Sequence, residues 1–471
     1  MTFNSFQFLV FLPMAFLAYW ALGRSVRLQN LFVVCASYVF YGWWDWRFLS
    51  LIAFTSAWSY AFGLLERRAA PRSRGSKVRL ALSCAVNLGI LGCFKYAGFF
   101  VGEAQSLLSA LGIHVHLPAL RLMLPVGISF YTFQALSYTI DVYRRAVAPT
   151  RDPVAFFAFI SFFPQLVAGP IERARDLLPQ FQSPRRFSYP EAVVGCRQML
   201  WGFFKKAVVA DNCAVCADAF LHSSPQGNGA AVWIGMLFFA FQIYGDFSGY
   251  SDIAIGVARL FGIRLTRNFA FPYFAQGMSD FWRRWHISLM AWFRDYLYIP
   301  LGGNRQGRLR HVVNIFVVFL VSGLWHGANW TFVLWGGYHA CLLMPSVLSA
   351  KAGADRRGVD PKGLLGMLRT FFLVVVGWTF FRARSVGECF DWVCAMFDLR
   401  SFSAVGHVPG MGYATVAVIT MLACEWFNRE GVFGFWRFPE RRSVRWAIYL
   451  FVAFASFLLL PRPQPFIYFQ F

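Results

Sequence analysis

The feature that most constrains this chain is a series of long apolar blocks that recurs along it. Each block holds roughly 17–25 residues, the length that crosses the hydrocarbon core of a bilayer as an α-helix. Hydrophobic residues make up 58% of the 471 residues and charged residues only 14%, whereas an ordinary soluble domain is about 25% charged. The sequence therefore predicts an all-α polytopic membrane protein that forms one transmembrane domain over residues 1–471.

The blocks also predict where the chain crosses the membrane. The predicted spans are residues 4–22, 30–46, 48–66, 80–100, 122–142, 194–221, 230–246, 311–328, 330–350, 364–382, 411–427 and 446–461. Two further apolar stretches, 153–170 and 247–300, are interrupted by Gly, Pro and charged residues. Such segments are tolerated at membrane depth only where protein or water covers the backbone. We therefore expect a bundle of about 11–13 membrane helices with re-entrant or interfacial segments.

The net charge of +22 could indicate a nucleic-acid-binding protein, but the positions of the basic residues argue against it. They lie in loops between the apolar blocks, at 67–79, 143–151, 264–310, 351–363 and 428–445, which is the positive-inside pattern of membrane proteins. These loops would face the cytoplasm, and the charge-poor loops at 101–121, 222–229 and 383–410 would face outward. No nucleic-acid partner is expected.

The first apolar block predicts the orientation of the N-terminus. No Lys or Arg precedes this block, and the first basic residues, Arg24 and Arg27, follow it. A secretory signal peptide has the reverse order. We therefore expect a first membrane helix whose N-terminus lies outside, which is the periplasm if the protein is in a bacterial inner membrane.

One imidazole, that of His326, lies inside an apolar block in the stretch VSGLWHGANW. It follows the basic end near Arg310 by about 15 residues, or roughly 22 Å of helix, so it is not expected at the cytoplasmic interface. Gly323 and Gly327 would let backbone or ligand approach it closely. An ionisable group within a membrane often marks a site, and burial favours the neutral imidazole, which can accept a proton. Position alone leaves open a structural role, a hydrogen bond to another helix.

A second histidine, His286, lies in the stretch SDFWRRWHISLMAWFRDYLYIP at 279–300. Projected as one helix, this stretch puts its charged residues and its aromatic residues on opposite arcs, with His286 on the seam. The pattern predicts an amphipathic helix in the membrane interface with its aromatic side chains inward. On the seam, His286 could belong to a site or could reach water at the rim.

Two acidic residues, Asp246 and Asp252, lie among Gly and Ser in QIYGDFSGYSDIAIG at 242–256. This composition predicts a broken helix that lines a cavity. Six residues apart, the two carboxylates do not share a helical face, so an acid/base pair is not expected. Pairing with the nearby cluster of Arg residues is the favoured role.

Two short motifs resemble metal or redox sites. Cys213 and Cys216 form a C-x-x-C in an apolar helical run with no second cysteine pair, which argues against a zinc or redox site. His114 and His116 form an H-V-H in a loop predicted to be external, but no third ligand is evident. No metal site is therefore expected.

Several longer motifs together resemble the membrane-bound O-acyltransferase family, in particular its bacterial branch that acylates cell-surface polymers. The motifs are FKYAGFF (94–100), LPVGISFYTFQALSYTIDVYR (124–144), FFPQLVAGPIER (162–173), QIYGDFSGYSDIAIG (242–256), FWRRWHISLMAWFRDYLYIPLGGNR (281–305) and SGLWHGANW (322–330). The resemblance extends from near residue 1 to about residue 340 and is weaker beyond it. It implies a helical bundle around a central funnel in which acyl donor and acceptor meet from opposite sides of the membrane.

The resemblance also implies roles for the two histidines. The invariant catalytic histidine of the family corresponds to His326, and its second histidine corresponds to His286. His326 would deprotonate a hydroxyl as it attacks a thioester carbonyl, in a tunnel that keeps water from the thioester. His286 would lie near the cytoplasmic face and position the donor or a partner.

The resemblance leads us to expect transfer of acetyl groups from a cytoplasmic thioester to a cell-surface polysaccharide such as alginate. The donor would be acetyl-coenzyme A or an acyl carrier protein, no cofactor would be tightly bound, and a periplasmic acetyltransferase-like protein would be a partner. Two alternatives stay open. The same fold could transfer D-alanine or acylate peptidoglycan or cellulose, or the chain could be a polymer or lipid transporter. A transporter often has internal repeats, and the sequence has none that we detect.

Overall fold

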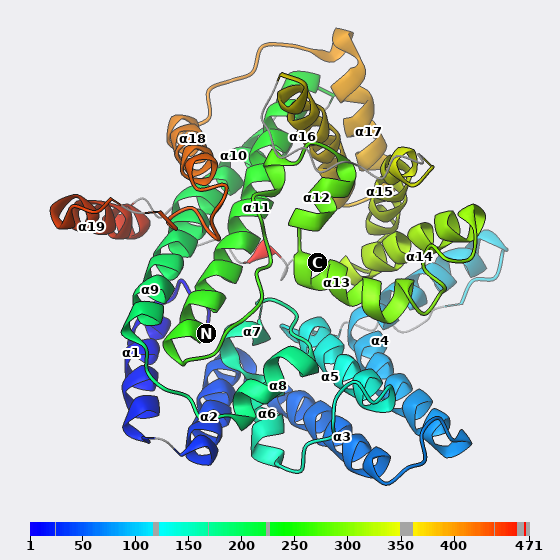
Figure 1. Ribbon diagram of the computed structural model, residues 1–471. Helices are drawn as coiled ribbons and strands as arrows, with labels where there is room; N and C mark the ends of the chain where they lie inside the picture. Colours follow the sequence, from blue (N-terminus) through cyan, green and yellow to red (C-terminus); the bar gives the residue numbers. More distant parts are fainter. Residues whose placement is uncertain are drawn as a thin grey trace. The chain divides into compact units, whose positions relative to one another are not determined.

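The computed structural model describes residues 1–23, 25–115, 122–167, 169–222, 227–348, 361–437, 439–458 and 466–467. Within these ranges the regular structure consists of helices and includes no β-strand (Figure 1). The all-α prediction is therefore confirmed. The chain forms two compact units, Met1–Ala192 with Ala258–Leu265 and Val193–Val257 with Thr266–Phe471. Whether the two units behave as the one domain expected from the sequence stays a prediction.

The first unit contains eight helices and a short 3-10 turn η1 (Trp46–Phe48) in its described part. The helices are α1 (Phe6–Ala21), α2 (Val26–Asp45), α3 (Leu49–Arg67), α4 (Arg74–Ala110), α5 (Ile128–Tyr143), α6 (Pro153–Ser161), α7 (Phe163–Leu166) and α8 (Ala174–Gln182). Buried polar groups in this unit bond across helices. Arg185 donates to the side-chain oxygen of Asn30 at 2.6 Å, and Arg79 pairs with the buried Glu66 of α3 at 3.1 Å. These bonds fix the ends of α2, α3 and α4.

In the described part of the chain, the second unit contains the remaining helices, except that the last residues of α11, from Ala258, belong to the first unit. These helices are α9 (Tyr189–Phe203), which begins in the first unit, η2 (Phe204–Ala210), α10 (Asp211–His222), α11 (Gly229–Leu260), η3 (Pro272–Phe274), α12 (Met278–Arg284), α13 (Ile287–Phe293), η4 (Arg294–Tyr298), α14 (Arg308–His326), α15 (Trp330–Leu348), α16 (Pro361–Arg382), α17 (Val386–Phe397), η5 (Leu399–Ser401), α18 (Met411–Phe427) and α19 (Arg442–Leu458). Two of the short segments, η2 and η4, are π-helical.

Six helical segments of the described chain are long and apolar enough to cross a membrane, and α1 and α18 are shorter apolar helices. The six are Val26–Arg67, Arg74–Ala110, Gly229–Leu260, Arg308–His326, Trp330–Leu348 and Lys362–Arg382. The predicted span 194–221 is also helical, as the run α9–η2–α10. Helix α5 covers the predicted span 122–142 from Ile128 onward, and α19 covers the described part of the predicted span 446–461, up to Leu458. The chain is thus a multi-pass membrane protein.

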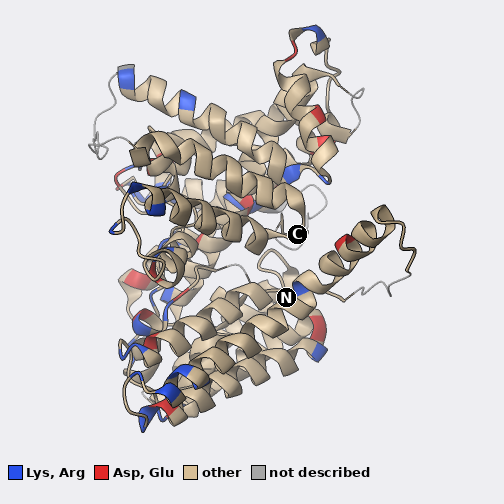
Figure 2. Ribbon diagram, turned by 90° about the vertical axis from the view of Figure 1, so that its right-hand side faces the viewer, with Lys and Arg blue, Asp and Glu red and all other residues tan. Residues whose placement is uncertain are grey.

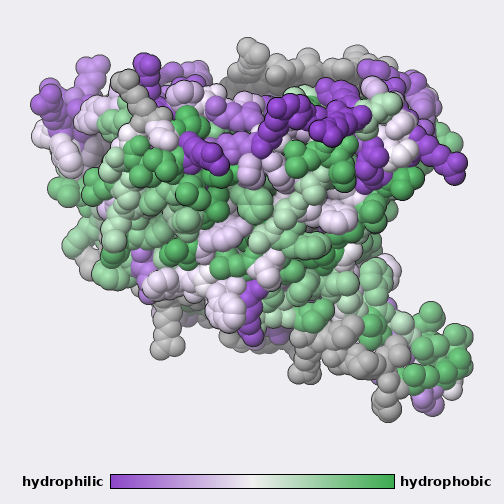
Figure 3. All heavy atoms as spheres, turned by 90° about the horizontal axis from the view of Figure 1, so that it is seen from below, coloured by the Kyte–Doolittle hydropathy of each residue, from purple (hydrophilic) through white to green (hydrophobic). Residues whose placement is uncertain are grey.

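The side chains on the surface agree with this conclusion. Lys and Arg gather at helix ends and in loops, while the middle parts of the long helices carry few charges (Figure 2). One face carries a broad band of hydrophobic side chains bordered by hydrophilic ones (Figure 3). Such a band is the surface that a bilayer covers.

Helix α11 organises the part of the second unit that holds the candidate site. It runs without a break through residues 247–256, so the broken helix predicted there from Gly and Ser is wrong. The glycines serve close contact instead. A Cβ at Gly249 would lie 2.8 Å from the carbonyl oxygen of Gly202, and a Cβ at Gly256 would lie 3.0 Å from the backbone nitrogen of Met199. Glycine therefore lets α11 lie directly against α9.

Candidate active site

Helices α14 and α15 form a tight antiparallel pair, and His326 lies at the turn between them. Two glycines allow the contact. A Cβ on Gly323 would overlap the carbonyl oxygen of Phe332, and a Cβ on Gly336 would overlap that of Phe319. The expected close approach of backbone next to His326 is therefore confirmed.

His326 is the last residue of α14 and is buried, with 4% of its surface exposed. It lies 18 residues after Arg308, or about 27 Å along the helix axis. Aromatic rings surround the imidazole. The ring centroids of Trp325, Trp335 and Phe381 lie 5.0, 5.1 and 5.3 Å from its own. Such walls exclude water from whatever reacts at this imidazole.

The segment around His286 does not form the single amphipathic helix predicted for 279–300. It breaks into α12, α13 and the π-helical η4, and His286 stands at the break with φ 43° and ψ 52°. Two backbone hydrogen bonds hold the break, from Ala270 N to Arg284 O and from Ile287 N to Asn268 O, both 2.9 Å. This tertiary pairing overrides the helical periodicity.

The break turns the side chain of His286 into the protein, where only 1% of the residue is exposed. The role of a water-facing rim residue is therefore wrong. The imidazole packs at 4.6 Å from the ring of Phe247, and its Nδ1 lies 3.1 Å from Asn268 Oδ1. Burial lowers the pKa of His286 to about 3, so the ring is neutral at physiological pH.

The two histidines predicted from the sequence are brought together around one indole. The ring centroid of Trp325 lies 6.0 Å from that of His286 and 5.0 Å from that of His326. We call His286 and His326 the histidine pair. The pair combines two imidazoles with apolar walls, an arrangement suited to moving a proton away from water.

A cluster of buried charges joins η2, α10 and α11, and Phe247 of α11 contacts His286. We call the cluster the charge network; it comprises Lys205, Lys206, Asp211, Asp246 and Asp252. Lys206 Nζ lies 2.7 Å from Asp246 and 2.8 Å from Asp211, while Lys205 Nζ lies 2.6 Å from Asp252. The predicted partners of Asp246 and Asp252, the Arg cluster, are therefore wrong, because two lysines take that place.

The π-helical turn η2 explains how two successive lysines both point inward. Successive side chains of an α-helix point about 100° apart around the helix axis. A π-helical turn is wider and changes this angle, and such turns are frequent at functional sites. Lys205 and Lys206 are 2% and 1% exposed, so both are buried.

The same network holds a piece of the C-terminal segment, because Ile467 N donates to Asp246 at 2.6 Å and Phe466 packs 4.4 Å from the ring of Tyr250.

Three parts of the site were not found from the sequence. Asn268, which contacts His286, lay within a stretch assigned to a basic loop. Phe381 belongs to α16, in the part of the chain where the motifs are weak. His339 of α15 is fully buried, with ring centroids 4.9 Å from both Trp282 and Trp335. A histidine inside the apolar run WGGYHACLL was a signal that could have identified it.

The short motifs noted for metal or redox chemistry do not join this site. Cys213 and Cys216 are buried in α10, and His114 is exposed, while His116 lies outside the described residues. Among the residues that the structure describes, no group of three or more His, Cys, Asp and Glu side chains could hold a metal ion.

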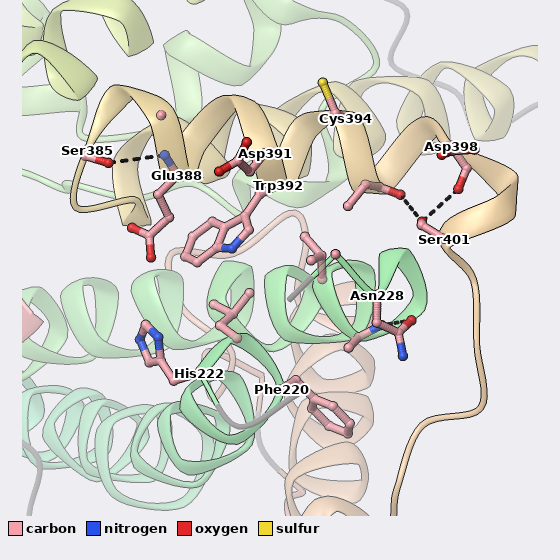
Figure 4. Close-up of a pocket in the computed structure, with 16 residues that line it drawn as sticks. Phe220, His222, Asn228, Ser385, Glu388, Asp391, Trp392, Cys394, Asp398 and Ser401 are labelled. Atoms are coloured by element: carbon pink, nitrogen blue, oxygen red, sulfur yellow. Dashed lines mark hydrogen bonds between the residues drawn. The ribbon is translucent and has the colours of Figure 1, made fainter. Parts of the chain in front are cut away.

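A separate pocket of about 890 Å³ lies between α10, α11 and α17 (Figure 4). Its walls include His222, Trp392 and three acidic residues, Glu388, Asp391 and Asp398. The Glu388 carboxylate and the His222 imidazole both point into the space between the helices (Figure 4). Burial and the nearby Arg382 and Arg384 lower the pKa of His222. The carboxylates that line the pocket do not attract an anionic polymer.

The relatives found by comparison with known proteins share one type of activity, acyl transfer. The model of the membrane-bound O-acyltransferase family matches residues 145–352, which include both members of the histidine pair. The chain is 38% identical to a probable alginate O-acetylase of Pseudomonas putida over the whole of both chains. It is 35% identical to a peptidoglycan O-acetyltransferase of Helicobacter pylori over 83% of this chain and 79% of the relative. It is 29% identical to a teichoic acid D-alanyltransferase of Bacillus subtilis over 48% of this chain and 60% of the relative.

Proposed function

Because this chain belongs to the membrane-bound O-acyltransferase family, we propose that it takes acetyl groups from a cytoplasmic thioester and moves them across the bacterial inner membrane to O-acetylate a cell-surface polysaccharide such as alginate. Membership makes the chain a membrane O-acyltransferase, and the sequence alternative of a transporter is not supported. One observation carries the finer proposal. The histidine pair lies buried around Trp325, behind aromatic walls.

The chemistry of the pair follows from the reaction. A hydroxyl oxygen attacks the thioester carbonyl, the C–O bond forms, and the C–S bond breaks. The hydroxyl proton passes to the imidazole of His326 and then to the departing thiolate, so the base returns to its neutral form. His286 contacts the same indole and orients the reacting molecules. The apolar walls keep water away from the thioester, so transfer outruns hydrolysis.

The donor would approach from the cytoplasm. The loops predicted to be cytoplasmic are basic, as in 264–310, and basic surfaces suit an anionic carrier such as coenzyme A or an acidic carrier protein. No tightly bound cofactor is needed, because the thioester supplies the activated acyl group. The N-terminus would lie in the periplasm.

On the periplasmic side, the acyl group would pass to a separate acetyltransferase-like protein rather than directly to the polymer. The loops predicted to be external supply the walls of the pocket in Figure 4, and these include Glu388, Asp391 and Asp398. A long anionic polymer normally requires basic contacts. The acidic lining therefore supports the hand-off.

Vesicles test this proposal. The purified protein is reconstituted with a labelled acetyl thioester inside and alginate outside, with and without the candidate periplasmic partner. We expect donor consumption in the wild type, none above background in His326→Ala, and labelled polymer only with the partner. Labelled polymer at an undiminished rate without a partner would show that this chain completes the reaction alone.

Reporter fusions test the orientation. A reporter that is active only in the cytoplasm should give signal after Arg74, in the basic loop at 67–79, and none after Ser224, in the loop at 222–229. The opposite pattern would reverse the side from which the donor approaches.

A further inference from the structure

We propose that Asn268 is the positioning residue of the site: it holds His286 as the Nδ1–H tautomer, so that Nε2 accepts a hydrogen bond from a neutral O–H or N–H group of the reacting molecules. The inference rests on the proposed function for the identity of those molecules. The tautomer itself follows from the hydrogen bonds around one buried amide.

The orientation of the Asn268 amide is fixed by a donor that cannot change. The backbone N–H of Ser288 donates to Asn268 Oδ1 at 3.3 Å, and a backbone N–H is always a donor. If the amide were turned over, its NH₂ group would face this N–H, and two donors cannot form a hydrogen bond with each other. On the other side, Nδ2 of Asn268 donates to Ser251 Oγ on α11 at 3.2 Å. The oxygen of the amide therefore faces the α13 segment.

An oxygen that faces His286 fixes the imidazole in turn. His286 Nδ1 lies 3.1 Å from Asn268 Oδ1, and an amide oxygen can only accept, so Nδ1 carries the proton. In the neutral ring, Nε2 then holds a lone pair. Among the described residues, no group bonds Nε2, although this nitrogen is buried.

A buried acceptor without a partner is costly, by about 1–3 kcal/mol, and is retained where a ligand or a reacting group supplies the missing bond. The rings of Phe247 and Trp325 lie beside the imidazole, at 4.6 and 6.0 Å. The missing partner is therefore a neutral donor group carried by a molecule that tolerates apolar walls. The hydroxyl of an acyl acceptor and an amide N–H of a thioester carrier both meet this description.

The charged groups around His286 are occupied elsewhere. On α11, Asp246 and Asp252 pair with Lys206 and Lys205. Arg267, which precedes Asn268, donates to the carbonyl oxygens of Phe269 and Gly431, and Arg284 of α12 pairs with Asp280. On α14, the facing titratable group is His326. A carboxylate introduced at position 268 would therefore add a negative charge next to His286 Nδ1, where no paired charge already lies.

The first test reads the tautomer without requiring turnover. In detergent-solubilised protein with ¹⁵N-labelled histidine, His286→Asn identifies the resonances of His286. We expect a protonated Nδ1 and an unprotonated Nε2. A protonated Nε2 in the wild type would overturn the inference, whatever the donor or the polymer proves to be. The correct tautomer in a protein that consumes no thioester would instead contradict the proposed function and leave this inference standing.

The second test distinguishes the two sources of the donor group. Coenzyme A and alginate oligosaccharide are added separately to the labelled protein. A shift of the Nε2 resonance with coenzyme A alone assigns the bond to the carrier, and a shift with the oligosaccharide alone assigns it to an acceptor hydroxyl. If neither compound moves the resonance at saturating concentration, and the candidate periplasmic partner does not move it either, Nε2 does not bind a reacting molecule.

The third test uses two substitutions of Asn268. Asn268→Leu removes the acceptor for Nδ1–H and should lower kcat by about 10²-fold. Asn268→Asp keeps the acceptor but adds a negative charge that stabilises the imidazolium, so the acidic limb of the pH–rate profile should move to higher pH. A purely structural residue would not move that limb, and an unchanged limb would refute the positioning role.

Asn314→Leu is the matched control. Asn314 is also a buried asparagine of this unit, and its amide donates to the carbonyl oxygen of Gly303 at 2.8 Å, away from the histidine pair. We expect it to lose stability but to keep both the tautomer of His286 and the pH–rate profile. If Asn314→Leu changes these as Asn268→Leu does, the effect reports general loss of structure and not positioning.

Discussion

The charge network and the histidine pair lie in the same compact unit, and His286 packs against Phe247 of α11, the helix that carries Asp246 and Asp252. The two groups nevertheless treat buried polar atoms in opposite ways. In the charge network, each lysine has a carboxylate within 2.8 Å. Around His286, aromatic rings and one amide replace charges, and burial alone accounts for the lowered pKa. The charge network neutralises its charges by pairing them, whereas the surroundings of His286 leave its Nε2 without a hydrogen-bond partner among the described residues.

This difference leads us to predict which buried polar groups hold the helices together and which take part in the proposed acyl transfer. Removing one member of a matched ion pair leaves an uncompensated charge, so its main cost is to stability. Removing an imidazole that takes part in the proposed reaction should lower the rate. It should affect stability little, because the aromatic neighbours are not left with an uncompensated charge. Measurements of rate and of stability in the same variants test this distinction.

The largest expected effect is on rate. His326→Ala should lower acetyl transfer by about 10²–10⁴-fold while the protein inserts and purifies normally, because a positioned base is lost from an apolar surrounding. Donor consumption by reconstituted protein measures the rate, and thermal unfolding in detergent measures stability. His311→Ala, on the same helix and next to Tyr298, is the control and should keep the wild-type rate. Substantial transfer by His326→Ala would remove this residue from the mechanism.

The next effect is on stability. Lys206→Met should destabilise the protein by about 3–5 kcal/mol, because Asp211 and Asp246 would then be buried together without a cation. Thermal unfolding in detergent measures the loss. Adding Asp211→Asn and Asp246→Asn to the same chain should recover most of it. A single variant as stable as the wild type would show that the network does not hold the helices.

A smaller effect comes from the contact that places His326. Gly323→Ala forces a Cβ against the Phe332 carbonyl oxygen and should cost about 1–3 kcal/mol, with some loss of rate as the α14–α15 pair separates. Gly337→Ala is the matched control, since its Cβ would meet only the Leu320 side chain, at 3.8 Å. Equal stability of the two variants would contradict the tight backbone contact.

The smallest effect concerns pH. The pKa of His286 is about 3 in the folded chain and about 6.5 when unfolded. Below pH 6.5 the unfolded chain binds a proton that the folded chain does not, so stability falls as pH falls, by roughly 1.4 kcal/mol per unit for this group. Unfolding between pH 7.5 and 5 should show a shallower slope in His286→Asn than in the wild type. Asn also adopts a left-handed backbone readily. Identical slopes would mean that His286 is not buried as described.

The membrane class of the fold was predictable because composition and block length are properties of the sequence alone. The positions of α14 and α15 followed from the same blocks. The break at His286 was not predictable, because it depends on hydrogen bonds to residues 268–270 that helical periodicity does not contain. Nor was the inward direction of Lys205 and Lys206, since a π-turn shifts the angle between successive side chains.

The candidate site was predictable in part. A histidine within an apolar block marked His326 on physical grounds, but its catalytic role came from the resemblance to known sequences and stays a prediction. Asn268 carries no local signal, because its importance arises from a contact with a residue 18 positions away. Phe381 joins the site only when α16 packs against α14 and α15.

The pair of backbone hydrogen bonds beside His286 has a consequence for motion. Residues between Ala270 and Arg284 form a loop closed by these bonds, and residues with positive φ, Phe271 and His286, lie beside its two ends. Opening the loop would release the imidazole and the Asn268 amide together. The amide hydrogens of Ala270 and Ile287 should then exchange with solvent deuterium in a single step with one opening free energy. The site would be switched off whenever this small cooperative unit unfolds, and binding of a reacting molecule to His286 would slow that exchange.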